Sequence, residues 1–150
     1  MSFLPIAGRL VVMTTMFALV AYTAHAKKPE KDADILGTWT LTKVLDSADI
    51  ASLTDQQAAA LVGKVMVVRR DSVMFNGELC RGPELTRRRH DTAKYVRDGY
   101  HARVGSLGLP DIVMVVDLDC TEAFLKEREK IVVFWQGYFY DAVRRPQAKH

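Results

Sequence analysis

The stretch "IVVFWQGYFYDAVRR", residues 131–145, decides the fold. Two runs of β-branched and aromatic residues, Ile131–Trp135 and Tyr138–Arg144, are separated only by Gln136-Gly137. A link of two residues with glycine between such runs predicts an antiparallel hairpin. A third run, Phe124–Arg128, precedes the first across another two-residue link. The carboxyl-terminal part of the chain is therefore predicted to form an antiparallel meander.

The same signals recur upstream. Trp39 and Leu41 alternate with threonines after Gly37, which is typical of a half-buried strand. Further strands are expected at 64–70, 72–76, from Glu78 onward and at 112–118, with Asn76-Gly77 as a hairpin turn. Together these segments predict a mainly β protein. We expect an up-and-down barrel of seven or eight antiparallel strands, because closure removes exposed sheet edges; a β-sandwich is the alternative.

One helix is expected after the first strand. Thr54 is followed three residues later by Gln57, which forms a capping box, and alanines and a leucine follow. Gly63 lies where such a helix ends, so the helix is predicted over about 55–62. Residues 81–108 show no clear period, and Tyr95–Val104 is the one segment there that could form a strand.

The first 26 residues resemble a secretory signal peptide. Arg9 precedes thirteen uncharged residues, Leu10–Tyr22, and Ala24-His25-Ala26 places small residues at the positions that a signal peptidase recognises. The apolar run is short for a membrane-spanning helix. We therefore expect cleavage after Ala26 and export to a bacterial periplasm, with an uncleaved anchor or a core helix as alternatives. A polar, mobile leader over 27–34 and a single β domain over 35–146 would follow.

Two cysteines remain after that cleavage, Cys80 and Cys120. In an oxidising compartment an even pair predicts a disulfide. The alternatives are two buried thiols, or a cysteine nucleophile paired with His90 or His101, although no activating motif surrounds either cysteine.

The tripeptide Gly37-Thr38-Trp39 opens the first strand, and Arg144 and Arg145 end the last. This arrangement resembles the lipocalin/calycin families. The resemblance implies that Trp39 closes one end of a barrel and that an arginine of the last strand packs over its ring, where cation–π attraction contributes about 0.5–2 kcal/mol. The order of elements is also similar to that of many short exported bacterial proteins.

Positive charge concentrates in the middle of the chain. Residues 64–105 hold 10 lysines and arginines against 5 acids. Within them we single out one cluster as a contact surface for an anionic envelope component, lipid or protein, with a solvated loop as the alternative. The cluster consists of Arg81, Arg87, Arg88, Arg89 and His90. It is too short for a nucleic-acid reader, and export also argues against nucleic acid.

Other candidate sites are weaker. Trp135, Tyr138 and Tyr140 could include an outward-facing aromatic set that binds a partner. Asp117 and Asp119 would share one strand face and could act as acid and base in hydrolysis, or simply face solvent. The histidines, His90, His101 and His150 among them, lack ligand spacing, and no cofactor motif occurs, so neither a metal nor a cofactor is expected.

These observations favour a non-enzymatic periplasmic module. It would hold an apolar or amphipathic ligand in a barrel mouth, or bind and block an envelope enzyme. The alternatives are a small hydrolase that uses Asp117 and Asp119, and a structural envelope stress factor. The volume of the barrel interior separates a ligand carrier from a surface binder.

Overall fold

The computed structural model describes residues 31–146. The expected signal peptide, the first part of the leader and His150 lie outside this range. The described chain forms nine strands and two helices. Their bounds are β1 Gly37–Ser47, α1 Asp55–Ala59, β2 Val65–Val68, β3 Ser72–Phe75, β4 Glu78–Arg81, β5 Arg87–Asp91, α2 Thr92–Tyr100, β6 Ile112–Asp117, β7 Glu122–Glu127, β8 Lys130–Trp135 and β9 Tyr138–Arg144.

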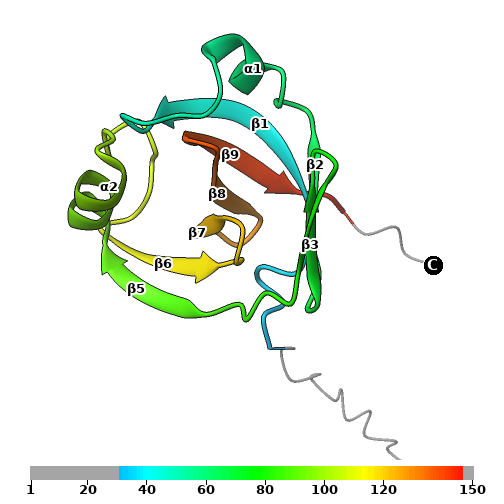
Figure 1. Ribbon diagram of the computed structural model, residues 1–150. Helices are drawn as coiled ribbons and strands as arrows, with labels where there is room; N and C mark the ends of the chain where they lie inside the picture. The colour runs from blue at the N-terminus through cyan, green and yellow to red at the C-terminus, as the bar shows by residue number, and fades with distance from the viewer. Residues whose placement is uncertain (1–30, 147–150) are drawn as a thin grey trace, which may run out of the picture.

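All nine strands belong to one sheet, in the order β4-β3-β2-β1-β9-β8-β7-β6-β5, and every neighbouring pair is antiparallel. The expected mainly β, antiparallel architecture is thus confirmed. The sheet curves around a common interior, and its two edge strands, β4 and β5, are consecutive in the chain (Figure 1). No ladder joins β4 to β5 in the described chain, so the expected closure into a barrel is not established.

The meander that the quoted stretch predicts is present as β7, β8 and β9. Trp135 pairs with Tyr138 across the turn, whose residues Gln136 and Gly137 both have positive φ. The pairing of β9 with β1 then joins the last strand to the first. Adjacent residues of β8 enter different cores: Ile131 and Val133 face one, and Val132 faces the other. The run is continuously apolar because both faces of this part of the sheet are buried.

The larger core lies inside the curved sheet and contains Trp39, Phe75 and Tyr140. The smaller core lies on the outer face of β6–β9, where Val96 of α2 packs with Phe124 and Phe139. In Figure 1, α2 lies outside the ring of strands, beside β5 and β6.

Residues 81–108, whose sequence shows no clear period, differ from the expectation. They contain β5 and α2, and the strand expected over Tyr95–Val104 is wrong. Helix α2 begins after Asp91, whose carboxylate accepts a hydrogen bond from the Lys94 amide at 2.8 Å. It ends at His101, which adopts a left-handed conformation. The expected seven or eight strands become nine because β5 was not foreseen.

The first helix follows its prediction more closely. The amide of Thr54 donates to Gln57 Oε1 at 2.8 Å, and the amide of Gln57 donates to Thr54 Oγ1 at 3.3 Å, which completes the capping box. The helix ends at Ala59 rather than near residue 62, and a turn leads to Gly63 at φ +88°.

Cys80 and Cys120 form the predicted disulfide, with their Cα atoms 6.1 Å apart. Cys80 lies on the edge strand β4, and Cys120 lies in the turn between β6 and β7. The bond therefore connects the two sides of the sheet that no ladder joins.

We expect the double variant Cys80→Ser/Cys120→Ser to lose about 2–5 kcal/mol of unfolding free energy, because the bond closes a long loop and restricts the unfolded chain. Urea unfolding measures this change, and wild-type protein unfolded with a reductant serves as the control. A variant with the wild-type midpoint and slope would contradict the structural role of the bond.

Candidate functional site

Trp39 lies at the end of the sheet where β1 begins and β9 ends. Its side chain is fully buried, and its indole Nε1 donates to the carbonyl of Ile35 at 2.8 Å. The guanidinium of Arg144 lies over the indole ring, 4.2 Å from the ring centroid. The contact predicted from Gly37-Thr38-Trp39 and the terminal arginines is thus confirmed for Arg144.

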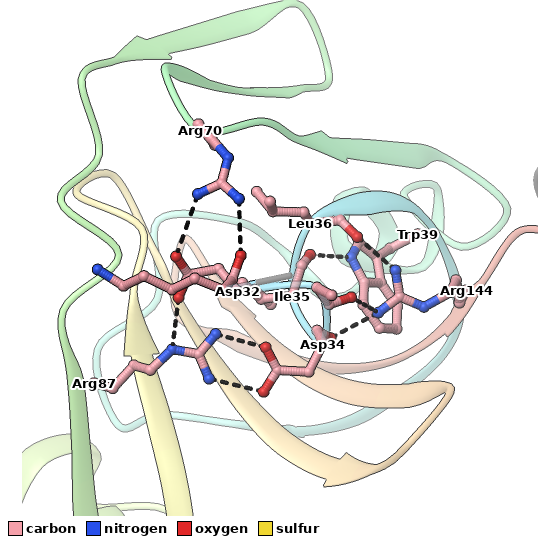
Figure 2. Close-up of polar contacts among 10 residues, drawn as sticks. Asp32, Asp34, Ile35, Leu36, Trp39, Arg70, Arg87 and Arg144 are labelled. Atoms are coloured by element: carbon pink, nitrogen blue, oxygen red, sulfur yellow. Dashed lines mark hydrogen bonds and ion pairs between the residues drawn. The ribbon is translucent and has the colours of Figure 1, made fainter. Parts of the chain in front are cut away.

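Arg144 is held by further contacts with the chain that precedes β1 (Figure 2). Its Nη1 donates to the carbonyl of Leu36 at 2.5 Å, and its Nη2 donates to that of Asp34 at 2.7 Å. Its Nε lies 2.9 Å from a carboxylate oxygen of Glu129 in the β7–β8 turn. One side chain therefore fastens the first strand, the last strand and the segment before them.

Gly37 makes room for this arginine. Its φ of +135° is one that side-chain-bearing residues rarely adopt, and a Cβ there would lie 2.7 Å from Arg144 Nη1. Position 37 therefore requires glycine, because any larger residue would collide with Arg144 where it packs over Trp39.

The last residues of the expected leader make ion pairs with the sheet (Figure 2). Arg87 of β5 makes two hydrogen bonds to the Asp34 carboxylate, at 2.6 and 2.7 Å, and a third to Asp32 at 3.1 Å. On the other side, Arg70 of the β2–β3 turn lies 3.7 Å from Asp32. Asp32 thus bridges the two sides of the sheet that β4 and β5 leave unpaired.

These contacts shift the pKa values of Asp34 and Arg87. The hydrogen bonds from Arg87 lower the pKa of Asp34 below its ordinary value of 3.8, although partial burial opposes the shift. The same hydrogen bonds raise the pKa of Arg87. Both groups are therefore charged at neutral pH, and each compensates the other.

The predicted basic cluster does not form one patch. Successive residues of a strand face opposite sides, so Arg87 and Arg89 share one face of β5 and Arg88 and His90 share the other. Arg87 is neutralised by the leader, whereas Arg88 and Arg89 are exposed. Arg81 lies across the gap, at the end of β4.

A different grouping of arginines emerges at the end of the sheet that carries Trp39. The strand registers bring the β2–β3 turn, the end of β4 and the β7–β8 turn to this same end. We call this surface the basic end. Its cations are Lys31, Arg69, Arg70, Arg81, Arg87, Arg128, Lys130, Arg144 and Arg145, and its carboxylates are Asp32, Asp34, Asp71, Glu84, Glu127 and Glu129.

An open groove of about 1010 Å³ crosses the basic end, between the leader and the last residues of β9. Two of its arginines are not used in ion pairs within residues 31–146. Arg128 is exposed in the β7–β8 turn, and Arg145 makes only a 3.1 Å hydrogen bond from its side chain to Thr40 Oγ1. The sequence interpretation did not assign either as a contact residue, because Arg128 lies between two glutamates and Arg145 was considered only as a partner of Trp39.

The expected outward-facing aromatic set is not found. Trp135, Tyr138 and Tyr140 are all buried in the larger core. The hydroxyl of Tyr138 donates to Asp55 at 2.7 Å, which raises the pKa of Tyr138. Trp135 Nε1 has no hydrogen-bond acceptor among the described residues.

Asp117 and Asp119 do not share a strand face. Strand β6 ends at Asp117, and Asp119 lies in the following turn at φ +70°, where its amide donates to the Asp117 carboxylate at 2.8 Å. The residue opposite Asp117 is Glu122 of β7. In the described part of the chain, no three His, Cys, Asp or Glu side chains are grouped so that they could hold a metal ion.

Side chains fill the interior of the sheet. Trp39, Met66, Ile131, Val133 and Tyr140 have no accessible surface. A void large enough for a water molecule would expose the atoms that line it. No ligand-sized cavity therefore borders these side chains. Neither helix within residues 31–146 is long and apolar enough to cross a membrane. Comparisons of the chain with protein-family models, curated proteins and solved structures return no match.

The ion pair of Asp34 predicts an acid-dependent loss of stability. Because its pKa is lowered in the folded state, its contribution is fully present above the ordinary value of 3.8 and is lost as pH falls through the folded value. We expect the gap in unfolding free energy between wild type and Asp34→Asn to shrink as pH falls from about 5 to about 2. Urea unfolding across this range measures it.

The matched variant is Asp49→Asn, which removes an exposed carboxylate that has no ion pair within the described residues. Its gap to wild type should stay small throughout the range. A gap for Asp34→Asn that does not change with pH would rule out the assigned ion pair.

Proposed function

We propose that the protein is an exported, non-enzymatic binding module that docks peripherally, through its basic end, on a phosphate-bearing lipid surface of the cell envelope. One observation carries the proposal: the basic end holds nine cations against six carboxylates. The arginines that hold the fold, Arg87 and Arg144, are paired internally, whereas Arg128 and Arg145 are left without an acid in the described chain.

The chemistry of these groups suits phosphate. A guanidinium presents a planar fork of donors that matches phosphate oxygens, and it stays charged at every physiological pH. Arg128 lies in the β7–β8 turn and Arg145 directly follows β9, so these two arginines come from different segments of the surface rather than from one pocket. Such a distribution fits a charged surface better than one small ligand. Among the described residues, the basic end exposes no large aromatic side chain that could insert into lipid, so docking would rest on charge.

The orientation of the charge supports the same conclusion. At the opposite end of the sheet, Asp46, Asp49, Asp55 and Glu78 flank the strand ends and α1, and Arg103 pairs with Asp46, so acids outnumber this cation there. A molecule with one basic and one acidic end is turned by an anionic surface so that the basic end faces it.

Export to the periplasm remains part of the proposal. It is supported by the pattern of residues 1–26 and by the disulfide, which is typical of oxidising compartments. We also propose that the sheet is a lipocalin/calycin-like barrel with a seam between β4 and β5. The packing of Arg144 on Trp39 supports this assignment, and the disulfide and Asp32 span the seam.

The other candidate functions receive less support. A carrier of an apolar ligand needs interior volume, and the interior side chains described above leave none around them. A hydrolase that uses Asp117 and Asp119 needs both carboxylates directed at one substrate. Asp117 instead ends β6 and accepts a hydrogen bond from the backbone amide of Asp119, which lies in the following turn.

Binding to lipid vesicles tests the proposal. Wild-type protein should bind vesicles that contain a phosphate-rich anionic lipid, should ignore purely zwitterionic vesicles, and should dissociate as salt rises above about 0.15 M. Because each basic residue near such a surface contributes about 1 kcal/mol, Arg128→Gln/Arg145→Gln should weaken binding roughly thirtyfold.

The matched control is Lys94→Gln/Arg97→Gln, which removes two exposed cations from α2 and changes the net charge equally. It should weaken binding much less than the pair at the basic end. Equal losses for the two pairs, or binding that ignores salt, would contradict docking through the basic end. Absence of vesicle binding together with specific capture of an acidic envelope protein would replace the lipid surface by that protein.

A further inference from the structure

A small polar cavity lies on the outer face of β5, β6 and β7, beside α2. Its volume is about 120 Å³, the space of roughly four water molecules. The charged and aromatic side chains that line it come from three strands and the helix. They are Arg88, His90, Tyr95, Asp117 and Glu122.

The floor of this cavity is fixed by hydrogen bonds. The hydroxyl of Tyr95 donates to the Glu122 carboxylate, with its oxygen 2.9 and 3.1 Å from the two carboxylate oxygens, and the hydroxyl of Tyr100 donates to the same carboxylate. Burial and the hydrogen bond to this carboxylate raise the pKa of Tyr95 to about 12, so its hydroxyl stays a hydrogen-bond donor. The ring of His90 stacks on that of Tyr95 at 3.9 Å and forms one wall.

The charges around the cavity are not balanced by one another. Asp117 and Glu122 are directly opposite on neighbouring strands, an arrangement in which like charges destabilise a sheet. Arg88 lines the same cavity, yet it makes no ion pair with either carboxylate or with any other described residue. A pair of carboxylates and a guanidinium thus face a shared space without contact between them.

We infer that this cavity binds a small zwitterion of the amino-acid type, with its ammonium group between Asp117 and Glu122 and its carboxylate on Arg88. Only a ligand with both charges satisfies both sides: a simple cation would meet Arg88, and a simple anion would meet two carboxylates. The volume admits a ligand of only a few non-hydrogen atoms, the size of alanine.

A metal ion fits less well. The two carboxylates supply too few ligands, and His90 stacks on Tyr95 rather than joining them: within residues 31–146 no three His, Cys, Asp or Glu side chains are grouped so that they could hold a metal ion. The cavity also lies on another face from the groove of the basic end and shares no lining residue with it. The inference therefore stands apart from the proposed docking on lipid.

Titration with three probes, followed by amide NMR shifts, tests the inference. Alanine carries both charges, alaninamide lacks the carboxylate, and propionate lacks the ammonium group. Alanine should shift amides of β5, β6 and β7 saturably at concentrations below about 100 mM. Alaninamide and propionate should bind roughly tenfold more weakly or worse, because each lacks one charged contact.

Two variants and two matched controls locate the site. Asp117→Asn keeps an oxygen for the Asp119 amide but removes the charge, and Arg88→Gln removes the guanidinium; each should weaken alanine binding roughly tenfold or more. Asp119→Asn lies in the adjacent turn, where Asn tolerates the positive φ, and Arg89→Gln lies on the other face of β5; both should bind alanine as wild type does.

Selective binding of alanine that both charge variants reduce would support the zwitterion site. The inference is overturned if alanine produces no saturable shift, if the three probes bind equally, or if the controls weaken binding as much as Asp117→Asn and Arg88→Gln.

Discussion

The packing of Arg144 on Trp39 is the interaction on which the rest of the structure depends. The guanidinium covers the indole, donates to carbonyls of the segment before β1, and pairs with Glu129. It therefore joins the first strand, the last strand and the leader in one contact, and it requires a glycine at position 37. With the leader fixed there, Asp32 and Asp34 are presented to Arg87 and Arg70 on the two sides of the unpaired gap.

This arrangement divides the four arginines that line the groove of the basic end into two groups. Arg87 and Arg144 are half-buried and pair with groups of the same molecule. Their removal would leave carboxylates and carbonyls without these hydrogen-bond donors. Arg128 and Arg145 lie outside this network and add positive potential without a structural contribution of similar size. The division explains how a molecule can hold many like charges at one end, since the inner group is compensated and only the outer group is offered to a partner.

Local signals predicted much of the fold. The hairpins, the capping box at Thr54, the disulfide and the contact of Trp39 with Arg144 all followed from short patterns or from the expected compartment. Strand β5 did not, because "RRRHD" has no apolar alternation and pairs only through the ladder supplied by β6. The pairs of Asp32 and Asp34 with Arg87 span 55 and 53 positions respectively, a separation that no local pattern encodes. Helix α2 did carry a signal, in Asp91 as N-cap and in the spacing of Val96 and Tyr100, but the β-forming residues from Tyr95 to Val104 outweighed it.

The most direct test compares the unfolding free energy, measured in urea, of two single variants: one at an internally paired arginine, Arg144, and one at an arginine without an ion pair among the described residues, Arg128. Arg144→Gln should lose at least about 3 kcal/mol, because it removes charged hydrogen bonds and the cation–π contact together. Arg128→Gln, which removes the same charge from the same end, should stay within about 0.5 kcal/mol of wild type. Similar changes for the two variants, or an Arg144→Gln variant as stable as wild type, would contradict the account.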